Sequence, residues 1–268
     1  MNGILPLNEQ KKLSLEILAD FARFCDEHDL RYFLAYGTLI GAVRHGGYIP
    51  WDDDVDVQMP RADYERLIEL YNREKRTEYY ELIAPTDRVS RHSIVKIVDR
   101  RTEKVEADVR YIDGPLGIDI DVFPLDGQPE SDAEYEKWYA ELQGVYKWHR
   151  HTVIPFVGSA KRRLAILLAK TLKGGRDRIL DTARKLHGRY PYDTSTYVGS
   201  VESEHNSKKN RYPRTCFERA IEMDFEGYRF KVPIGYDEIL TKMYGDYMQL
   251  PPAEAQVTHH VNEVYYKD

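Results

Sequence analysis

The feature that most constrains this chain is the run WDDDVDVQM, in which aspartates alternate with valines. Successive side chains of a β-strand point to opposite faces. A strand here would bury Val55 and Val57 in a core. The opposite face would then carry three carboxylates, those of Asp52, Asp54 and Asp56. The run therefore predicts a buried strand with acids crowded on its second face.

Crowded carboxylates repel one another and raise each other's pKa. A cation between them removes this cost, and carboxylate oxygens are the ligands that Mg²⁺, Mn²⁺ and Ca²⁺ prefer. The alternative is a solvated acidic loop without a ligand. The alternation with valine favours the metal site, so we expect Asp52, Asp54 and Asp56 to hold Mg²⁺ or Mn²⁺.

The residues before this run predict a phosphate-binding turn. The aromatic and apolar run YFLAY at 32–36 is typical of a short buried strand. Gly37 and Thr38 end it, and further glycines break the residues that follow. Backbone N–H groups in such a turn can cradle phosphates. We expect the Thr38 hydroxyl to add a contact and Arg44 to offset negative charge.

Two further strands carry charged side chains. Residues 93–102 alternate apolar positions around Lys96, which is either a solvated lysine at a sheet edge or a cation that faces phosphate. Residues 117–127 place Asp119 and Asp121 on one face. Either acid could complete a metal site with the aspartates of the first strand, and the pattern alone leaves the choice open.

The segment GTLIGAVRHGGYIPWDDDVDV resembles the LicD family, whose fold is that of the nucleotidyltransferases and whose distant relatives are the fukutin-type enzymes. Similar blocks recur in order: IDVFPLDG at 120–127, FEGYRFKVPIGYDEIL at 225–240 and YGDYMQLPP at 244–252. The resemblance covers roughly residues 10–127 and 217–260. It implies an α+β fold with a nucleotidyltransferase-like mixed sheet flanked by helices, and a helical insertion.

The resemblance also implies an activity. The best-known members of the family transfer phosphocholine, so we expect Mg²⁺-dependent transfer of a phospho-alcohol from a CDP-alcohol, most simply CDP-choline, with release of CMP. The acceptor would be a hydroxyl of a cell-surface glycan, such as a teichoic acid or lipopolysaccharide precursor. One rival is a nucleotidyltransferase that moves a nucleoside monophosphate from a triphosphate to a sugar or small alcohol. Another is a non-catalytic nucleotide- or metal-binding protein.

The family pattern assigns roles to residues. It selects Asp121 over Asp119 as the third acid, because DVFPLDG is the part that matches, and Asp54, Asp56 and Asp121 would be both metal ligands and catalytic residues. Similarity at K-I-x-D favours Lys96 as a phosphate-facing cation. The family's C-terminal ends suggest an acceptor or phosphate role for the pair His259 and His260, which otherwise lie in an exposed tail.

Helical patterns change character after residue 128. We expect a catalytic core at 1–128, a basic helical region at 129–195, and a C-terminal part at 196–268 that completes the same domain. The middle region carries a stripe of basic residues, namely Lys161, Arg162, Arg163, Lys170, Lys173, Arg176 and Arg178. This stripe is either a solvated helix face or a contact for an anionic acceptor or a membrane surface.

Composition narrows the class of protein. Of the 268 residues, 39 are basic and 45 acidic, giving a net charge of −6, so we expect no nucleic-acid partner. Two distant cysteines make no disulfide framework. The N-terminal residues are too polar for a signal peptide, and no apolar run reaches the ~20 residues of a membrane span. We therefore expect a cytoplasmic protein, with membrane contact at the inner face as an open alternative.

Overall fold

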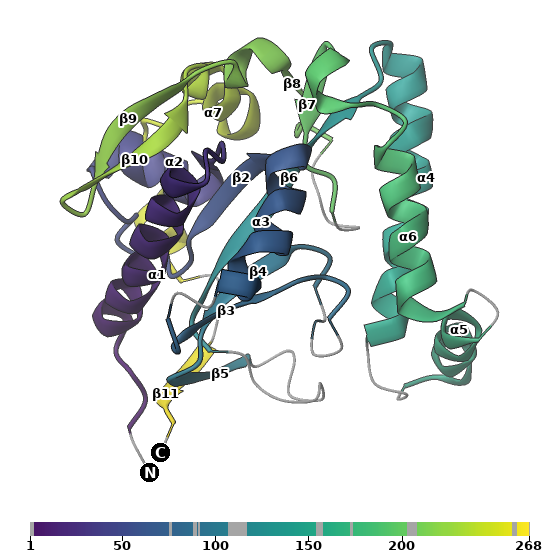
Figure 1. Cartoon of the computed structure of the whole chain (residues 1–268), viewed down its shortest axis with the longest axis horizontal. Helices are drawn as coiled ribbons and strands as arrows, with labels where there is room; N and C mark the ends of the chain where they lie inside the picture. The colour runs from purple at the N-terminus through teal and green to yellow at the C-terminus, as the bar shows by residue number, and fades with distance from the viewer. Residues whose placement is uncertain are drawn as a thin grey trace.

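The computed structural model describes residues 3–74, 77–87, 90, 92–106, 117–153, 158–171, 174–202, 208–258 and 262–267. A seven-stranded mixed sheet forms its centre, with the order β1-β2-β6-β4-β3; β7 pairs with β6, and β8 with β7 (Figure 1). These strands are β1 (Phe33–Leu34), β2 (Asp56–Pro60), β3 (Tyr80–Ile83), β4 (Val95–Asp99), β6 (Asp119–Gln128), β7 (Tyr197–Gly199) and β8 (Tyr212–Pro213).

Two small antiparallel pairs lie outside this sheet. The hairpin of β9 (Ala220–Phe225) and β10 (Tyr228–Pro233) turns at Glu226 and Gly227, both with positive φ. The second pair joins β5 (Thr102–Glu106) to β11 (Asn262–Tyr266). This pairing brings the end of the chain to its beginning, where the Leu5 N–H donates to the Val264 carbonyl over 2.7 Å.

The helices form two groups. α1 (Leu7–Glu27), α3 (Arg61–Glu74) and α7 (Tyr236–Tyr244) lie around the sheet, whereas α4 (Asp132–Val153), α5 (Ala160–Lys170) and α6 (Gly175–His187) stand together beside it (Figure 1). The short elements are α2 (Tyr36–Ile40), the π-helix η1 (Gly41–His45), and the 3₁₀ turns η2 (Tyr192–Thr194), η3 (Arg214–Phe217) and η4 (Ala253–Ala255). Within the described residues, no helix combines the length and apolarity needed to cross a membrane.

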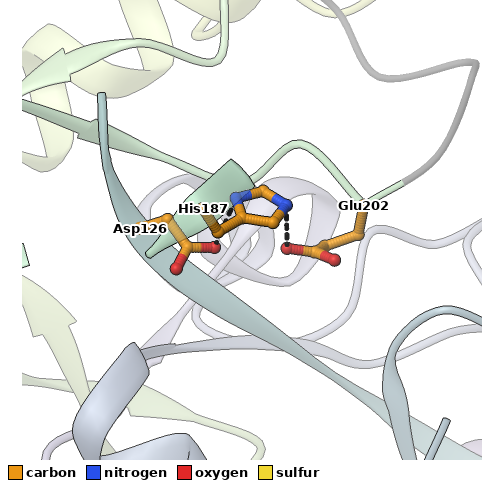
Figure 2. Close-up of side chains that lie close together, drawn as sticks. All are labelled: Asp126, His187 and Glu202. Atoms are coloured by element: carbon orange, nitrogen blue, oxygen red, sulfur yellow. Dashed lines mark ion pairs between the residues drawn. The ribbon is translucent and has the colours of Figure 1, made fainter. Parts of the chain in front are cut away.

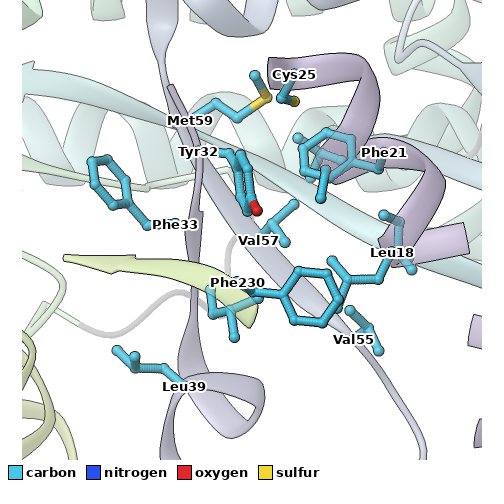
Figure 3. Close-up of a cluster of buried hydrophobic side chains, with 14 of the residues drawn as sticks. Leu18, Phe21, Cys25, Tyr32, Phe33, Leu39, Val55, Val57, Met59 and Phe230 are labelled. Atoms are coloured by element: carbon cyan, nitrogen blue, oxygen red, sulfur yellow. The ribbon is translucent and has the colours of Figure 1, made fainter. Parts of the chain in front are cut away.

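The core forms where α1 meets the sheet. α1 is an amphipathic helix, and its apolar face buries Leu18 and Phe21 completely. They pack with Val55 and Val57, the two valines that alternate with the aspartates (Figure 3). Burial of these valines fixes which face of β2 turns away from the core, because side chains alternate along a strand.

β6 is the strand that organises the sheet. It is ten residues long and pairs with β2 in parallel, with β4 antiparallel over its first half, and with β7 antiparallel over its last residues. The first half of β6 therefore lies between β2 and β4, whereas its last residues pair with β7. The α+β class with a mixed sheet flanked by helices is confirmed. The nucleotidyltransferase-like label and the three-part division at 1–128, 129–195 and 196–268 stay predictions.

Candidate active site

Two predicted acids lie side by side at the centre of the sheet. In the parallel register of β2 and β6, Asp56 is opposite Asp121. The chain holds both backbones in place: the Asp56 N–H donates to Thr38 Oγ1 over 2.9 Å, and the Asp121 N–H donates to the Val55 carbonyl over 2.9 Å. The structure thus brings together two carboxylates that are 65 residues apart in the sequence.

The other aspartates of the run lie in a loop, not in the strand that the alternation predicted. β2 begins only at Asp56, so Asp52 and Asp54 precede it. Their carboxyl groups nevertheless stay close enough for Asp54 to affect the pKa of Asp52, which burial raises. Asp52 also approaches the backbone so closely that a Cβ on Gly37 would lie 2.5 Å from its Oδ2. The glycine before Thr38 therefore makes room for a carboxylate.

Burial and mutual repulsion raise the pKa of these acids. The pKa of Asp56 lies well above its ordinary value because of burial, then because of Asp54, Asp121 and Asp52. Burial raises the pKa of Asp121 to about 6, Asp119 adds to this, and Lys96 opposes it. Burial is also the largest cause of the raised pKa of Asp52. Oxygen donors that are too crowded to ionise together fit a hard divalent cation, which would supply the missing positive charge.

Lys96 separates the roles of the two acids on β6. β4 is an interior strand, so Lys96 is not a solvated edge lysine; it is 6% exposed, opposite Asp121 in register. Its Nζ donates to both Asp119 and Asp121, and Lys104 also donates to Asp119. The two lysines hold the pKa of Asp119 below its ordinary range despite burial. Asp119 is therefore satisfied by cations of the chain, whereas the Asp121 side chain remains 25% exposed beside Asp56.

The predicted phosphate-binding turn has a different form. Gly37 and Thr38 lie in the first turn of α2, and the strand before them is only two residues long, because Tyr36 already belongs to the helix. The Thr38 hydroxyl accepts the Asp56 N–H, so it positions the strand. Arg44 donates from Nη1 to the Tyr247 carbonyl over 2.5 Å and thereby ties η1 to the segment after α7. Phosphate contacts of these residues stay predictions.

Lys11 and Glu226 anchor the loop before the acids, which the sequence did not indicate. Lys11 lies on α1, and its Nζ donates to the carbonyls of Ile49 and Pro50, each over 3.0 Å. Glu226, at the tip of the β9–β10 hairpin, accepts the Tyr48 N–H over 3.0 Å. Only the fold reveals these contacts, because the partners are far apart in the sequence.

The C-terminal family block reaches the site through Tyr244. Burial and then the charge of Asp56 raise the pKa of its hydroxyl, which places the end of α7 near the carboxylates. The predicted pair His259 and His260 lies outside the described residues.

A second charged cluster lies farther along β6, around Asp126. Asp126 is buried in the strand and accepts two hydrogen bonds from Arg61, from Nε over 2.7 Å and Nη2 over 2.6 Å. His187 of α6 lies between Asp126 and Glu202, with its ring nitrogens 3.0 and 3.5 Å from their oxygens (Figure 2). Tyr146 of α4 donates to Glu202 over 2.7 Å.

This cluster joins the helical group to the sheet. The ligand atoms of Asp126, His187 and Glu202 lie within 4.8 Å of one another, a spacing that a metal ion could use. Arg61 already bonds to both carboxylates, so the cluster contains its own cation. Burial lowers the pKa of His187, but Asp126 and Glu202 outweigh it and raise that pKa above its ordinary value. Arg61 and protonated His187 together balance the two carboxylates, which indicates a structural ion network.

Comparison with known proteins identifies the family. Residues 29–157 match the sequence model described as "LicD/FKTN/FKRP, nucleotidyltransferase domain". The lipopolysaccharide cholinephosphotransferase LicD of Haemophilus influenzae is 34% identical over 272 residues, which cover 97% of this chain and 98% of that protein. An uncharacterized protein of Rickettsia typhi is 40% identical over 58 residues, 21% of this chain and 19% of the relative.

A more distant similarity reaches a eukaryotic protein. The mannosyltransferase regulator 4 of Saccharomyces cerevisiae is 26% identical over 131 residues, which cover 47% of this chain and 11% of that protein. The match to the Haemophilus protein differs from this one because it spans nearly the full length of both chains. It includes the carboxylate site and the helical group. The chain belongs to the LicD family, as its motifs predict.

Proposed function

We propose that this protein transfers phosphocholine, or a similar phospho-alcohol, from a CDP-alcohol to a hydroxyl group of a cell-surface glycan precursor and releases CMP. The observation that carries this proposal is the pairing of Asp56 with Asp121 on adjacent parallel strands, where both have raised pKa values. The family relative from Haemophilus influenzae is named as a lipopolysaccharide cholinephosphotransferase, which supports choline as the alcohol and a glycan as the acceptor.

Asp54, Asp56 and Asp121, with Asp52 beside them, form a donor set that fits Mg²⁺ or Mn²⁺. Such an ion, when bound, would neutralise the diphosphate of the donor and stabilise the leaving phosphate. The chain contributes the rigid placement of the ligands. Thr38 fixes the start of β2 through the Asp56 N–H, and Lys96 orients the Asp121 carboxylate.

Asp121 is our candidate for the acceptor's proton. A general base must lie within hydrogen-bond reach of the proton that it accepts, and the Asp121 side chain is 25% exposed beside Asp56, where an acceptor hydroxyl could approach it. In this scheme the acceptor oxygen forms the new bond to the choline-bearing phosphorus. The bond from that phosphorus to the oxygen of CMP breaks, and the acceptor's proton passes to the Asp121 carboxylate.

Carboxylates that bind metal also suit the rival reaction, attack on the α-phosphate of a nucleoside triphosphate. The products distinguish the two. We would incubate the protein with CDP-choline, Mg²⁺ and deacylated lipopolysaccharide, and in parallel with CTP or UTP and a sugar, and follow both by ³¹P NMR. The proposal predicts CMP and a new phosphodiester signal in the first reaction. Pyrophosphate from the second reaction, with nothing from the first, would refute it.

A matched pair of variants links the product to the site. Asp56→Asn removes a central carboxylate, and we expect it to lower the rate about 100-fold or more, as the loss of a charge-stabilising group does in other enzymes. Asp53→Asn changes a neighbouring acid of the same run that is outside the predicted set of metal ligands, and it should retain activity. Equal losses in both variants would argue against the specific role of Asp56.

A further inference from the structure

Helix α5 (Ala160–Lys170) lies at the end of the helical group, away from the sheet (Figure 1). It packs on α4 and α6. Ser159 caps its N-terminus by accepting the Arg162 N–H over 3.3 Å. The side that meets the other helices buries Ile166 and Ala169, both at 0% exposure. α5 is therefore a fixed part of the fold with one face left to solvent.

The face of α5 that points to solvent carries leucines, whereas the solvent-facing side of a surface helix usually carries charged or polar residues. Leu164 and Leu167 are 56% and 49% exposed. Residues three apart in a helix share a face, whereas Leu164 and Ile166, two apart, point in nearly opposite directions. The helix thus has apolar side chains on two sides, of which the protein covers only the side of Ile166 and Ala169. Adjacent exposed leucines on a folded protein indicate a contact surface.

Basic residues flank these leucines. Lys161 lies on one side of them in the helical projection, with Arg163 and Lys170 on the other, and all are exposed. The Arg163 Nε donates to the Gly158 carbonyl over 3.0 Å, which keeps this side chain at the helix surface. α5 contains no acidic residue. This contrasts with the net charge of −6 for the whole chain.

We propose that the outer face of α5, formed by Leu164 and Leu167 with Lys161, Arg163 and Lys170, docks on an anionic membrane surface. An interfacial helix inserts its apolar side chains at the boundary between headgroups and acyl chains, and its basic side chains contact lipid phosphates. Leucines at the centre with cations on both flanks match this arrangement. The proposal rests on α5 alone and does not depend on the reaction that the carboxylate site performs.

Vesicle co-sedimentation of the full-length protein tests the proposal. Wild-type protein should bind vesicles that contain phosphatidylglycerol more tightly than vesicles of phosphatidylcholine alone, and high salt should weaken this binding. Leu164→Ser with Leu167→Ser should weaken it by about tenfold or more, because each leucine loses its burial in the lipid. Replacing Lys161, Arg163 and Lys170 by glutamine should weaken it by about fivefold for each charge removed.

Leu250→Ser is the matched control, because Leu250 is 52% exposed but lies outside α5. This variant should bind vesicles as the wild type does. A second readout does not depend on loss of binding: Leu167→Trp should show a blue-shifted emission, and quenching by brominated lipid, only with anionic vesicles. Absence of wild-type binding to anionic vesicles, an equal loss in Leu250→Ser, or an unquenched L167W in bound protein would each overturn the proposal.

Discussion

Replacing Arg61 by methionine should strongly destabilise the protein, although Arg61 contacts none of the acids at the candidate active site. Arg61 begins α3 directly after β2, and Asp126 follows the last residue of β6 that pairs with β2. Their ion pair therefore lies at the end of the parallel pairing of β2 with β6, the pairing whose register places Asp56 opposite Asp121.

The expected cost follows from burial. Arg61 donates two hydrogen bonds to Asp126, over 2.7 and 2.6 Å, and one to Glu202, over 3.2 Å. The side chains of the two acids are only 3% and 5% exposed, so water cannot replace the guanidinium. Methionine fills similar volume but leaves two buried carboxylates with His187 as their only cation in the described cluster. Breaking a buried ion pair in this way costs about 3–5 kcal/mol.

Urea denaturation at pH 7, followed by circular dichroism, measures this cost. Arg189→Met is the matched control, because Arg189, just after α6, forms an ion pair with Glu141 of α4 over 3.0 Å, but both side chains are about half exposed. An exposed pair contributes about 0–1 kcal/mol. Adding Asp126→Asn to Arg61→Met should restore part of the stability, since it removes one of the uncompensated charges. A loss below about 1 kcal/mol for Arg61→Met, or no rescue, would refute the reasoning.

Three further variants test the charges. Lys96→Met leaves Asp121 without its cation and the buried Asp119 with Lys104 alone. It should lower both the free energy of unfolding, by about 3 kcal/mol, and the rate of transfer, measured by urea denaturation and CMP release. Without divalent metal, the free energy of unfolding of the wild type should fall as pH rises above about 4, because the raised pKa of Asp56 favours the folded state only while this carboxyl is protonated. Asp56→Asn removes this ionisable group. Its melting temperature should therefore exceed that of the wild type at pH 8 and equal it at pH 4. Because the pKa of His187 is raised in the folded state, protonated His187 stabilises the fold fully below about pH 6.5, and this stabilisation is lost as pH rises through the raised pKa. His187→Asn should therefore reduce the fall in melting temperature at alkaline pH. An unchanged fall would contradict this.

Local pattern was enough to predict much of the site. The alternation of Val55 and Val57 with aspartates correctly placed the valines in the core, and the strand pattern around Lys96 was correct. The placement of Asp119 and Asp121 on one face of their strand was also correct, since Lys96 contacts both. Such features depend only on the period of two along a strand, which a sequence displays directly.

The remaining features depend on partners that are distant in the sequence. Asp119 and Asp121 look equivalent in the sequence, and the donation of Lys104 to Asp119 distinguishes them. Asp126 lies between Pro124 and Gly127, where a sequence favours a turn, but β6 continues through it and Arg61 donates to its carboxylate. The strand before Gly37 is shorter than the apolar run suggests, because tertiary contacts override local β-propensity.

The most direct test of the central claim is the thermal stability of the protein with CDP-choline, with and without Mg²⁺. A ligand at 100 times its dissociation constant adds about 2.7 kcal/mol to stability. We predict that CDP-choline with Mg²⁺ raises the melting temperature of the wild type, and that the Asp56→Asn/Asp121→Asn double variant remains folded but shows no such rise. Full stabilisation of the double variant by CDP-choline and Mg²⁺ would show that these carboxylates are not the site.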